Sequence, residues 1–234
     1  MKNSRIVEAV ILALGLLFLG LSIRGGFRIF SQKDRSVNVK GLAELEVKAD
    51  KVIWPLPFKD VGNDLVILYD NLKSKNQAII SFLKSNGIKD SEISISAPVV
   101  VDLEAERYSS NQNPYRYNIT SVITVTSDKV DVVRKLMSEQ GELLRQGIAV
   151  SGGDYQYNVQ YLFTKLNDIK PKMIEEATQN ARVAAEKFAK DSKSKLGKIK
   201  SAYQGQFDIS DRDANTPYIK NVRVVSTIEY YLKD

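Results

Sequence analysis

The sequence contains no cysteine and no histidine. The missing cysteine excludes disulfides, thiol nucleophiles and thiolate metal sites. The missing histidine removes the commonest general base near neutral pH and the commonest ligand of transition metals. Ser–His–Asp, Cys–His and His–zinc chemistries are therefore excluded. We expect a protein without a cofactor or a bound metal, and we expect it not to be an enzyme.

A strong excess of one charge is also missing, because 34 basic residues stand against 28 acidic ones, for a net charge of +6. This mild surplus permits attraction to anionic lipid headgroups without requiring it. Charged residues make up 26% of the chain and aromatic residues 9%, which is ordinary for a folded domain. We expect no nucleic-acid partner.

Long hydrophobic runs are absent except for one near the start of the chain. No charged residue lies between Ala9 and Ile23, and Lys2 and Arg5 precede this run. A helix of that length spans about 22 Å, short of the ~30 Å hydrocarbon core of a bilayer. If the run is extended back to Ile6, it approaches the length of a membrane-spanning helix.

We prefer an uncleaved signal anchor, inserted in a membrane through residues 6–23, over a cleaved signal peptide or a buried helix. The stretch "LSIRGGF" offers small residues, but Ile23 and Arg24 spoil an A-x-A cleavage pattern. Basic residues flank the run on both sides, so the positive-inside rule does not favour export. The alternative orientation, in which the domain faces the cytoplasm, is therefore also compatible with the sequence. The expected organisation is an anchor or signal peptide over 1–30, a linker over 31–36 and one domain over 37–234.

Period-two alternation predicts strands along most of the body. It runs from Val37 to Val47 and again from Val52 to Phe58, where Pro55 and Pro57 favour an edge or bulged strand. Further strands are expected over 93–103, 115–125 and 155–163. The segments "KIKSAYQGQF" and "YIKNVRVVSTIEYYL" are expected to close the sheet.

Helical periodicity predicts two main helices and a short one. The first lies within 61–86, and the short one follows Ser127 or Asp128. The long one begins at Asn167 or Asp168, and its predicted core face comprises Ile169, Met173, Ala177, Ala181, Ala184 and Phe188. The expected fold is α+β, a mainly antiparallel sheet backed by two main helices and preceded by an N-terminal membrane helix.

Four stretches resemble the SIMPL-domain family of mostly exported bacterial proteins: "VKGLAELEVKADKV", "YRYNITSVITV", "RQGIAVSGGDYQY" and "EEATQNARVAAEKFAKDSKSKLGKI". They are similar to the family's opening strand, its tyrosine-started strand, its glycine-rich connection and its alanine-spaced helix. The resemblance runs from about Val37 to the end of the chain. It implies a location in the cell envelope and a tendency to oligomerise, and it supplies no catalytic residues.

Two groups of carboxylates are candidates for a site. Asp102, Glu104 and Glu106 lie at a strand end and could bind a divalent cation through oxygen ligands. Glu44 and Glu46 share a strand face and could imitate a paired-carboxylate site. In both cases a solvated polar surface is the preferred interpretation.

Three other features of the sequence also have a functional and a structural interpretation. "GELLRQGIAVSGG" is rich in glycine but lacks the nucleotide-binding motifs, so a chain crossover is preferred. Tyrosines alternate along 155–161 and are expected to pack in the core or to serve an oligomer interface. A run of lysines could face anionic lipid or nucleic acid, although solvated lysines near a helix end are the simpler interpretation. These are Lys187, Lys190, Lys193, Lys195, Lys198 and Lys200.

These features together favour a non-catalytic protein held at a cell membrane by a single segment, with its main domain periplasmic or extracellular. We expect it to form a homo-oligomer or to bind another envelope protein. The alternative is an envelope enzyme, or a protein that binds a small ligand or a cation through carboxylates, lysine or tyrosine.

Overall fold

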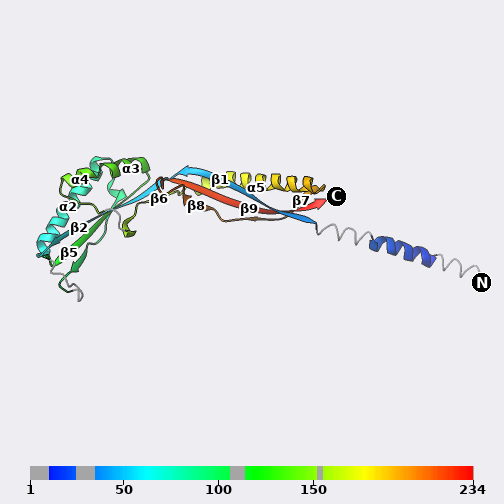
Figure 1. Ribbon diagram of the computed structural model, residues 1–234, viewed down its shortest axis with the longest axis horizontal. Helices are drawn as coiled ribbons and strands as arrows, with labels where there is room; N and C mark the ends of the chain where they lie inside the picture. Colours follow the sequence, from blue (N-terminus) through cyan, green and yellow to red (C-terminus); the bar gives the residue numbers. More distant parts are fainter. Residues whose placement is uncertain (1–10, 25–34, 106–113, 152–154, 234) are drawn as a thin grey trace, which may run out of the picture. The chain divides into compact units, whose positions relative to one another are not determined.

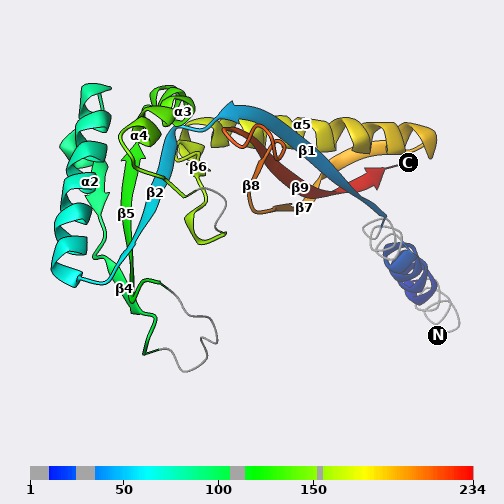
Figure 2. The ribbon, with the colours of Figure 1, turned by 60° about the vertical axis from the view of Figure 1, so that its left-hand side comes forward.

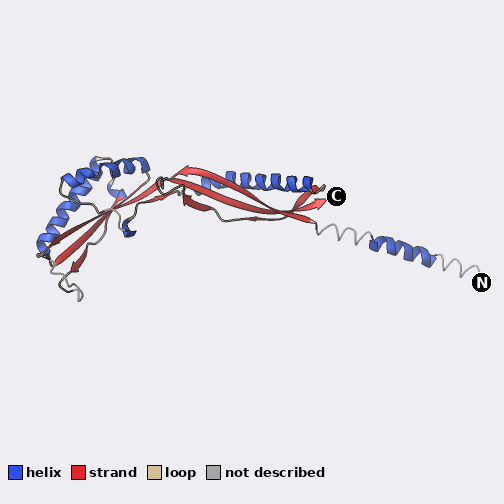
Figure 3. Cartoon of the chain, in the orientation of Figure 1, coloured by secondary structure: helices blue, strands red, loops and turns tan. Residues whose placement is uncertain are grey.

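The computed structural model describes residues 11–24, 35–105, 114–151 and 155–233. The chain divides into two compact units, one formed by Met1–Leu45, Asn167–Asp208 and Val222–Asp234, the other by Glu46–Leu166 and Ile209–Asn221. Both contain antiparallel strands and helices (Figure 3). The expected α+β class is confirmed, with two sheets in place of one.

The first unit is a sheet with one long helix along it, as Figures 1 and 2 show from two directions. The strand order is β1–β9–β7, and β8 also pairs with β9. The bounds are β1 Ser36–Lys48, α5 Leu166–Asp191, β7 Lys195–Gln204 and β9 Ile219–Lys233. The short strand β8 Asp208–Asp211 belongs to the second unit from Ile209 onward. Leu232 N–H donates to Arg35 O and Ala49 N–H donates to Tyr218 O, so β1 and β9 run antiparallel.

Alternation decides which face of this sheet lies under α5. In β1 the odd positions Val39 and Ala43 are buried, and the even positions are exposed. In β9 the even positions Val222, Val224 and Ile228 are buried. The predicted period-two pattern from Val37 to Val47 is therefore correct, and it marks the face that the helix covers.

The buried face of α5 repeats every fourth residue. Its buried residues are Met173, Ala177, Ala181, Ala185 and Ala189. The predicted face is thus correct as far as Ala181, and Ala184 is partly buried against the same core. It is wrong at its end, because Phe188 is 60% exposed and Ala189 is buried in its place. Residues four apart form a ridge inclined to the helix axis, and that ridge is the one that packs on the strands.

The second unit has the strand order β3–β5–β2–β6, with β4 also paired to β5. Its strands are β2 Lys51–Gly62, β3 Ile93–Ile95, β4 Val99–Asp102, β5 Tyr117–Ser127 and β6 Gln160–Leu162. Its helices are α2 Leu65–Ser85, α3 Val130–Glu139 and α4 Gly141–Arg145, with 3-10 turns at Asp90–Glu92 and Tyr155–Tyr157. The long pair β2 and β5 runs from Val52 opposite Ser127 to Gly62 opposite Tyr117.

One face of this pair carries the core of the second unit. Leu56 and Phe58 of β2 and Ile123 of β5 are buried there. Ile79 and Leu83 of α2 belong to the same hydrophobic cluster. The helix begins at Asp64, whose carboxylate accepts hydrogen bonds from Val66 N and Ile67 N.

β2 does not lie at an edge, although its prolines predicted an edge or a bulge. It is paired on both sides, but β6 covers only Lys51–Ile53 of it. The carbonyl of Pro57 accepts a bond from Ser151 N at 2.7 Å, on the side away from β5. In an antiparallel ladder the backbone N and C=O of one residue point to the same side of the strand, and those of the residue two positions earlier point to that side as well. The backbone nitrogens of Pro57 and Pro55 thus both point away from β5. Pro55 and Pro57 therefore remove no donor from the ladder with β5.

Three other element predictions need correction. The strand expected over 93–103 is interrupted between β3 and β4, where Pro98 stands. The strand expected over 155–163 is reduced to Gln160–Leu162, because Tyr155–Tyr157 form a 3-10 turn. The stretch expected to be a chain crossover contains the short helix α4.

The hydrophobic run near the start of the chain is helical over residues 11–24. In the described part of the chain, no helix is both long and apolar enough to cross a membrane. Residues 6–10 of the expected anchor lie outside the described residues. The N-terminal membrane helix therefore stays a prediction.

Candidate functional site

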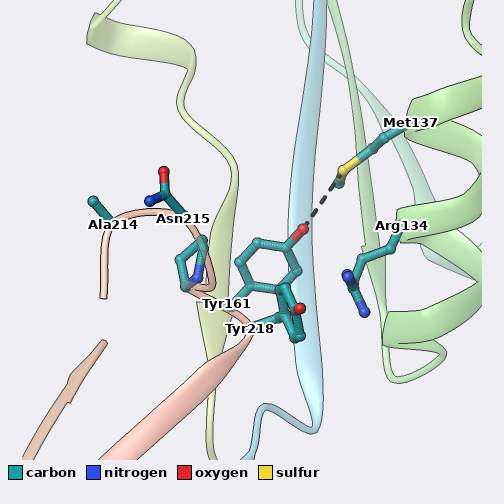
Figure 4. Close-up of a pocket in the computed structure, with 7 residues that line it drawn as sticks. Arg134, Met137, Tyr161, Ala214, Asn215 and Tyr218 are labelled. Atoms are coloured by element: carbon teal, nitrogen blue, oxygen red, sulfur yellow. Dashed lines mark hydrogen bonds between the residues drawn. The ribbon is translucent and has the colours of Figure 1, made fainter. Parts of the chain in front are cut away.

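The candidate site is an open pocket of about 480 Å³ in the second unit. Figure 4 shows that its side chains come from α3, from β6 and from the loop before β9. The residues that line it are Arg134, Met137, Tyr161, Ala214, Asn215, Pro217 and Tyr218.

The loop that forms one wall is held by Asp213. Its carboxylate accepts bonds from Asn215 N and Thr216 N, each at 2.9 Å, and from the Thr216 hydroxyl. Arg212 Nε also donates to it at 3.1 Å. The hydroxyl of Thr216 and the guanidinium of Arg212 lower the pKa of Asp213 from 3.8 to about 2. At neutral pH this carboxylate is ionised and fixes the wall of the pocket.

Arg134 and two tyrosines form the floor. The guanidinium carbon of Arg134 lies 3.3 Å from the ring centroid of Tyr218, and its Nη1 is 3.4 Å from Asp131 Oδ1. Tyr161 meets Tyr218 edge to face, with centroids 6.2 Å apart, and its hydroxyl donates to Met137 Sδ at 3.6 Å. Stacking of this kind orders a cation and aromatic rings.

The pocket is suited to binding more than to catalysis. Burial raises the pKa of the Tyr161 hydroxyl above 10.0, so this group stays protonated at neutral pH and is no base. The guanidinium of Arg134 can attract an anionic group, and the tyrosines offer aromatic faces and edges. A small aromatic anion fits this combination of groups.

The described carboxylates that the sequence singled out are paired with arginines. Asp102 is engaged by Arg116, whose Nη2 and Nε lie 3.0 and 3.2 Å from its Oδ2. This hydrogen bonding lowers the pKa of Asp102. Glu104 is 3.5 Å from the same guanidinium, and Glu106 lies outside the described residues. Across the described ranges, no three acidic side chains gather as metal ligands.

Glu44 and Glu46 do not act as a pair. Glu44 lies 3.5 Å from Arg223 Nε, and Glu46 lies 3.5 Å from Arg212 Nη1. Each carboxylate has its own arginine, and both lie on the exposed face of β1.

A comparison with protein families matches residues 37–227 to SIMPL, described as "Protein of unknown function (DUF541)". The chain belongs to the SIMPL family. The match confirms the family that the four sequence stretches resemble. The comparison with curated proteins found no match.

The remaining candidates of the SIMPL domain lie in separate places. In the glycine-rich stretch, Gly147 has a φ of 77° after α4, as expected for a helix end, and Gly152 and Gly153 lie outside the described residues. Tyr161 joins the pocket, whereas Tyr157 is half-buried beside Trp54 and Val159. The lysine run is exposed at the end of α5 and along β7.

Sequence reasoning missed Arg134, Tyr218 and the contact between them. No spacing links α3 to a residue more than eighty positions later. It also missed an exposed apolar run, "LVILY", at the start of α2. That run carried a signal, because five large apolar residues in succession cannot all lie on one helix face.

Proposed function

We propose that this SIMPL protein is anchored in a membrane, lies mainly outside the cytoplasm and associates there with further copies of itself, without catalysing a reaction. The anchor in this proposal is the segment 6–23. Its support is the uncharged run from Ala9 to Ile23 with basic residues before it. An intact mass that places the start of the mature chain near Gly25 would contradict a retained anchor.

The observation that carries the association is an apolar surface at the start of α2, which we call the α2 surface. Its residues are exposed to 41% at Leu65, 71% at Val66, 59% at Ile67 and 56% at Tyr69. Only Leu68 among these neighbours is buried. Contiguous exposed apolar side chains mark interaction sites on soluble domains.

The α2 surface continues onto the end of the long strand pair. Asn63 joins the two segments, since its Nδ2 donates to Pro114 O at 3.3 Å and its Oδ1 accepts from Arg116 N at 2.8 Å. Tyr115 lies between these two partners in sequence and is 46% exposed, and Val61 is 41% exposed. Tyrosine and large apolar residues are enriched at protein interfaces.

A second copy is the occupant that fits this surface. A two-fold interface brings the same patch of both subunits together, and an apolar patch is complementary to itself. Two acidic residues border the patch. Asp64 precedes Leu65 and its carboxylate caps α2, and Asp70 follows Tyr69.

Sedimentation velocity of the full chain in detergent tests the association. We expect an oligomer for the natural sequence and a monomer for the double variant Val66→Ser and Ile67→Ser. Leu144→Ser is the matched control, because Leu144 is an isolated apolar residue, 60% exposed, on α4. If the natural chain is monomeric, or if the control dissociates as readily as the α2 variant, self-association through this surface is wrong.

The pocket beside Arg134 favours a second candidate function, the binding of a small aromatic anion. Benzoate is a suitable probe, since it combines a ring with a carboxylate. Binding predicts shifts of the Tyr161 and Tyr218 resonances in NMR titrations, and their loss in Arg134→Gln. Unchanged spectra at millimolar benzoate would reject an aromatic-anion site.

A further inference from the structure

Basic side chains gather at one end of the first unit, which we call the basic end. It comprises Arg35, Lys190, Lys193, Lys195 and Lys233. Arg35 Nη2 donates to Ser194 Oγ at 3.1 Å, and Lys193 N donates to Lys190 O at 3.1 Å. Lys195 stands opposite Lys233 in the β7–β9 register. The start of β1, the turn after α5 and the end of β9 therefore meet here.

The acidic groups near the four lysines of the basic end are paired with other lysines. Asp191 pairs with Lys187 at 3.1 Å, and Glu229 pairs with Lys200 at 2.9 Å. Asp34 and Asp234 adjoin the basic end in sequence. Like charges directly opposite each other on neighbouring strands are unfavourable, so Lys195 and Lys233 gain from an external anion.

An exposed aromatic residue lies beside these lysines. Phe188 is one turn from the end of α5, between Lys187 and Lys190, and it is 60% exposed. Ile199 of β7 is 51% exposed. Lysines together with exposed Phe and Ile are typical of surfaces that lie in a membrane interface, where the charges meet headgroups and the apolar side chains enter below them.

We propose that the basic end binds anionic lipid headgroups of the membrane in which residues 6–23 are anchored, with Phe188 inserted at the interface. This inference rests on the proposed anchor. Only ten residues lie between Arg24 and Arg35, and the eleven residue steps span at most about 40 Å. The anchor thus holds the basic end close to the headgroups, which raises its effective concentration there.

A fluorescence measurement on the full chain in vesicles tests the contact. The chain has no cysteine, so Ser192→Cys, in the turn after α5, can carry one polarity-sensitive dye. We expect emission at least about twofold higher in vesicles of phosphatidylcholine and phosphatidylglycerol than in phosphatidylcholine alone. The difference should shrink in about 0.5 M salt, where the Debye length falls to a few ångströms.

Charge reversal provides the matched comparison. The triple variant Lys190→Glu, Lys193→Glu and Lys195→Glu should abolish the response to phosphatidylglycerol. The control triple carries the same charge change on exposed lysines of the second unit and should retain the response; its substitutions are Lys48→Glu, Lys59→Glu and Lys73→Glu. Phe188→Ala should lower the emission in both kinds of vesicle. Equal emission of the basic-end and control triples would overturn the proposal.

Flotation and an alkaline wash separate this inference from the anchor. If the chain stays in the vesicles after the wash but the dye emission does not respond to phosphatidylglycerol, the anchor is retained and only the lipid contact is refuted. A chain that washes out and ignores anionic vesicles refutes both. A dye that responds to added DNA and not to anionic vesicles would make the basic end a nucleic-acid site and the lipid proposal wrong.

Discussion

Gly41 lies against Ala177 so closely that a Cβ atom built at Gly41 would be 1.8 Å from the Ala177 carbonyl oxygen. The same atom would be 2.4 Å from the backbone nitrogen of Ala181. One residue further along β1, Leu42 O accepts a hydrogen bond from Asn180 Nδ2 at 2.8 Å. The backbones of β1 and α5 therefore touch, and this contact depends on a glycine facing two alanines.

Gly41→Ala should lower the free energy of unfolding by about 3 kcal/mol or more, because the added methyl group meets backbone atoms that cannot rotate away. Thermal and urea denaturation followed by far-UV circular dichroism will measure the loss. Gly141→Ala is the control, since nothing lies within 4 Å of its added Cβ. In the first turn of α4 it should be neutral or stabilising by up to about 1 kcal/mol. Equal stability of Gly41→Ala and the natural chain would contradict the close contact.

Met173→Ala should destabilise the protein much more than Phe188→Ala. Met173 is 1% exposed, so its truncation should cost about 2–5 kcal/mol. Phe188 is 60% exposed, so its truncation should cost less than about 1 kcal/mol. Circular dichroism is the right probe, because it reports on helix α5 directly, whereas the single tryptophan, Trp54, belongs to the second unit. A larger loss of stability for Phe188→Ala than for Met173→Ala would mean that the helix face predicted from sequence is the buried one.

Asp213 should make the stability of its loop depend on acid pH. Its folded-state pKa of about 2 lies below the ordinary 3.8, so the ionised form is favoured by folding. The resulting stabilisation is present above about pH 4 and is lost as the pH falls through about 2. NMR titration of the carboxyl carbon measures this pKa directly. Thr216→Val should move it upward by removal of the hydroxyl donor, and a pKa that stays near 2 in this variant would contradict the role of Thr216.

Removal of divalent cations should leave the melting temperature unchanged. Asp102 and Glu104 interact with the Arg116 guanidinium, which occupies the place that a cation would take. Calorimetry of the full chain with and without a chelator checks this expectation. A fall of more than several degrees would indicate an oxygen-ligand cation site. Asp102→Asn would then remove the sensitivity to the chelator if that site is the one predicted from sequence.

The elements best predicted from sequence are those in which one strong pattern acts alone. Alternation in β1 and β5, and helical periodicity in α2, identified these segments because one face of each is buried. The long helix was also predicted, but the predicted buried face departs from the observed one after Ala181 and ends at Phe188, which is exposed. A large apolar residue weighs heavily in a pattern, whereas the close contact with Gly41 selects small residues every fourth position along α5.

The pocket could not be predicted, because tertiary contacts assemble it. Arg134 and Tyr218 meet through folding of a loop that Asp213 holds by local hydrogen bonds. Tyrosines 155 and 157 alternate with polar residues as a strand would, yet they form a 3-10 turn. Only Gln160–Leu162 of this segment pairs with β2. The alternating sequence pattern is therefore longer than the strand that forms.

The central claim, a SIMPL domain anchored in a membrane with its body outside the cytoplasm, is tested most directly by labelling one introduced cysteine. Ser81→Cys lies on an exposed position of α2 in a chain that has no other cysteine. Intact spheroplasts are treated with a membrane-impermeant maleimide, and their membranes are then washed at alkaline pH. The account predicts that the labelled chain stays in the washed membranes. Labelling that occurs only after lysis, or a chain that the wash releases, would contradict it.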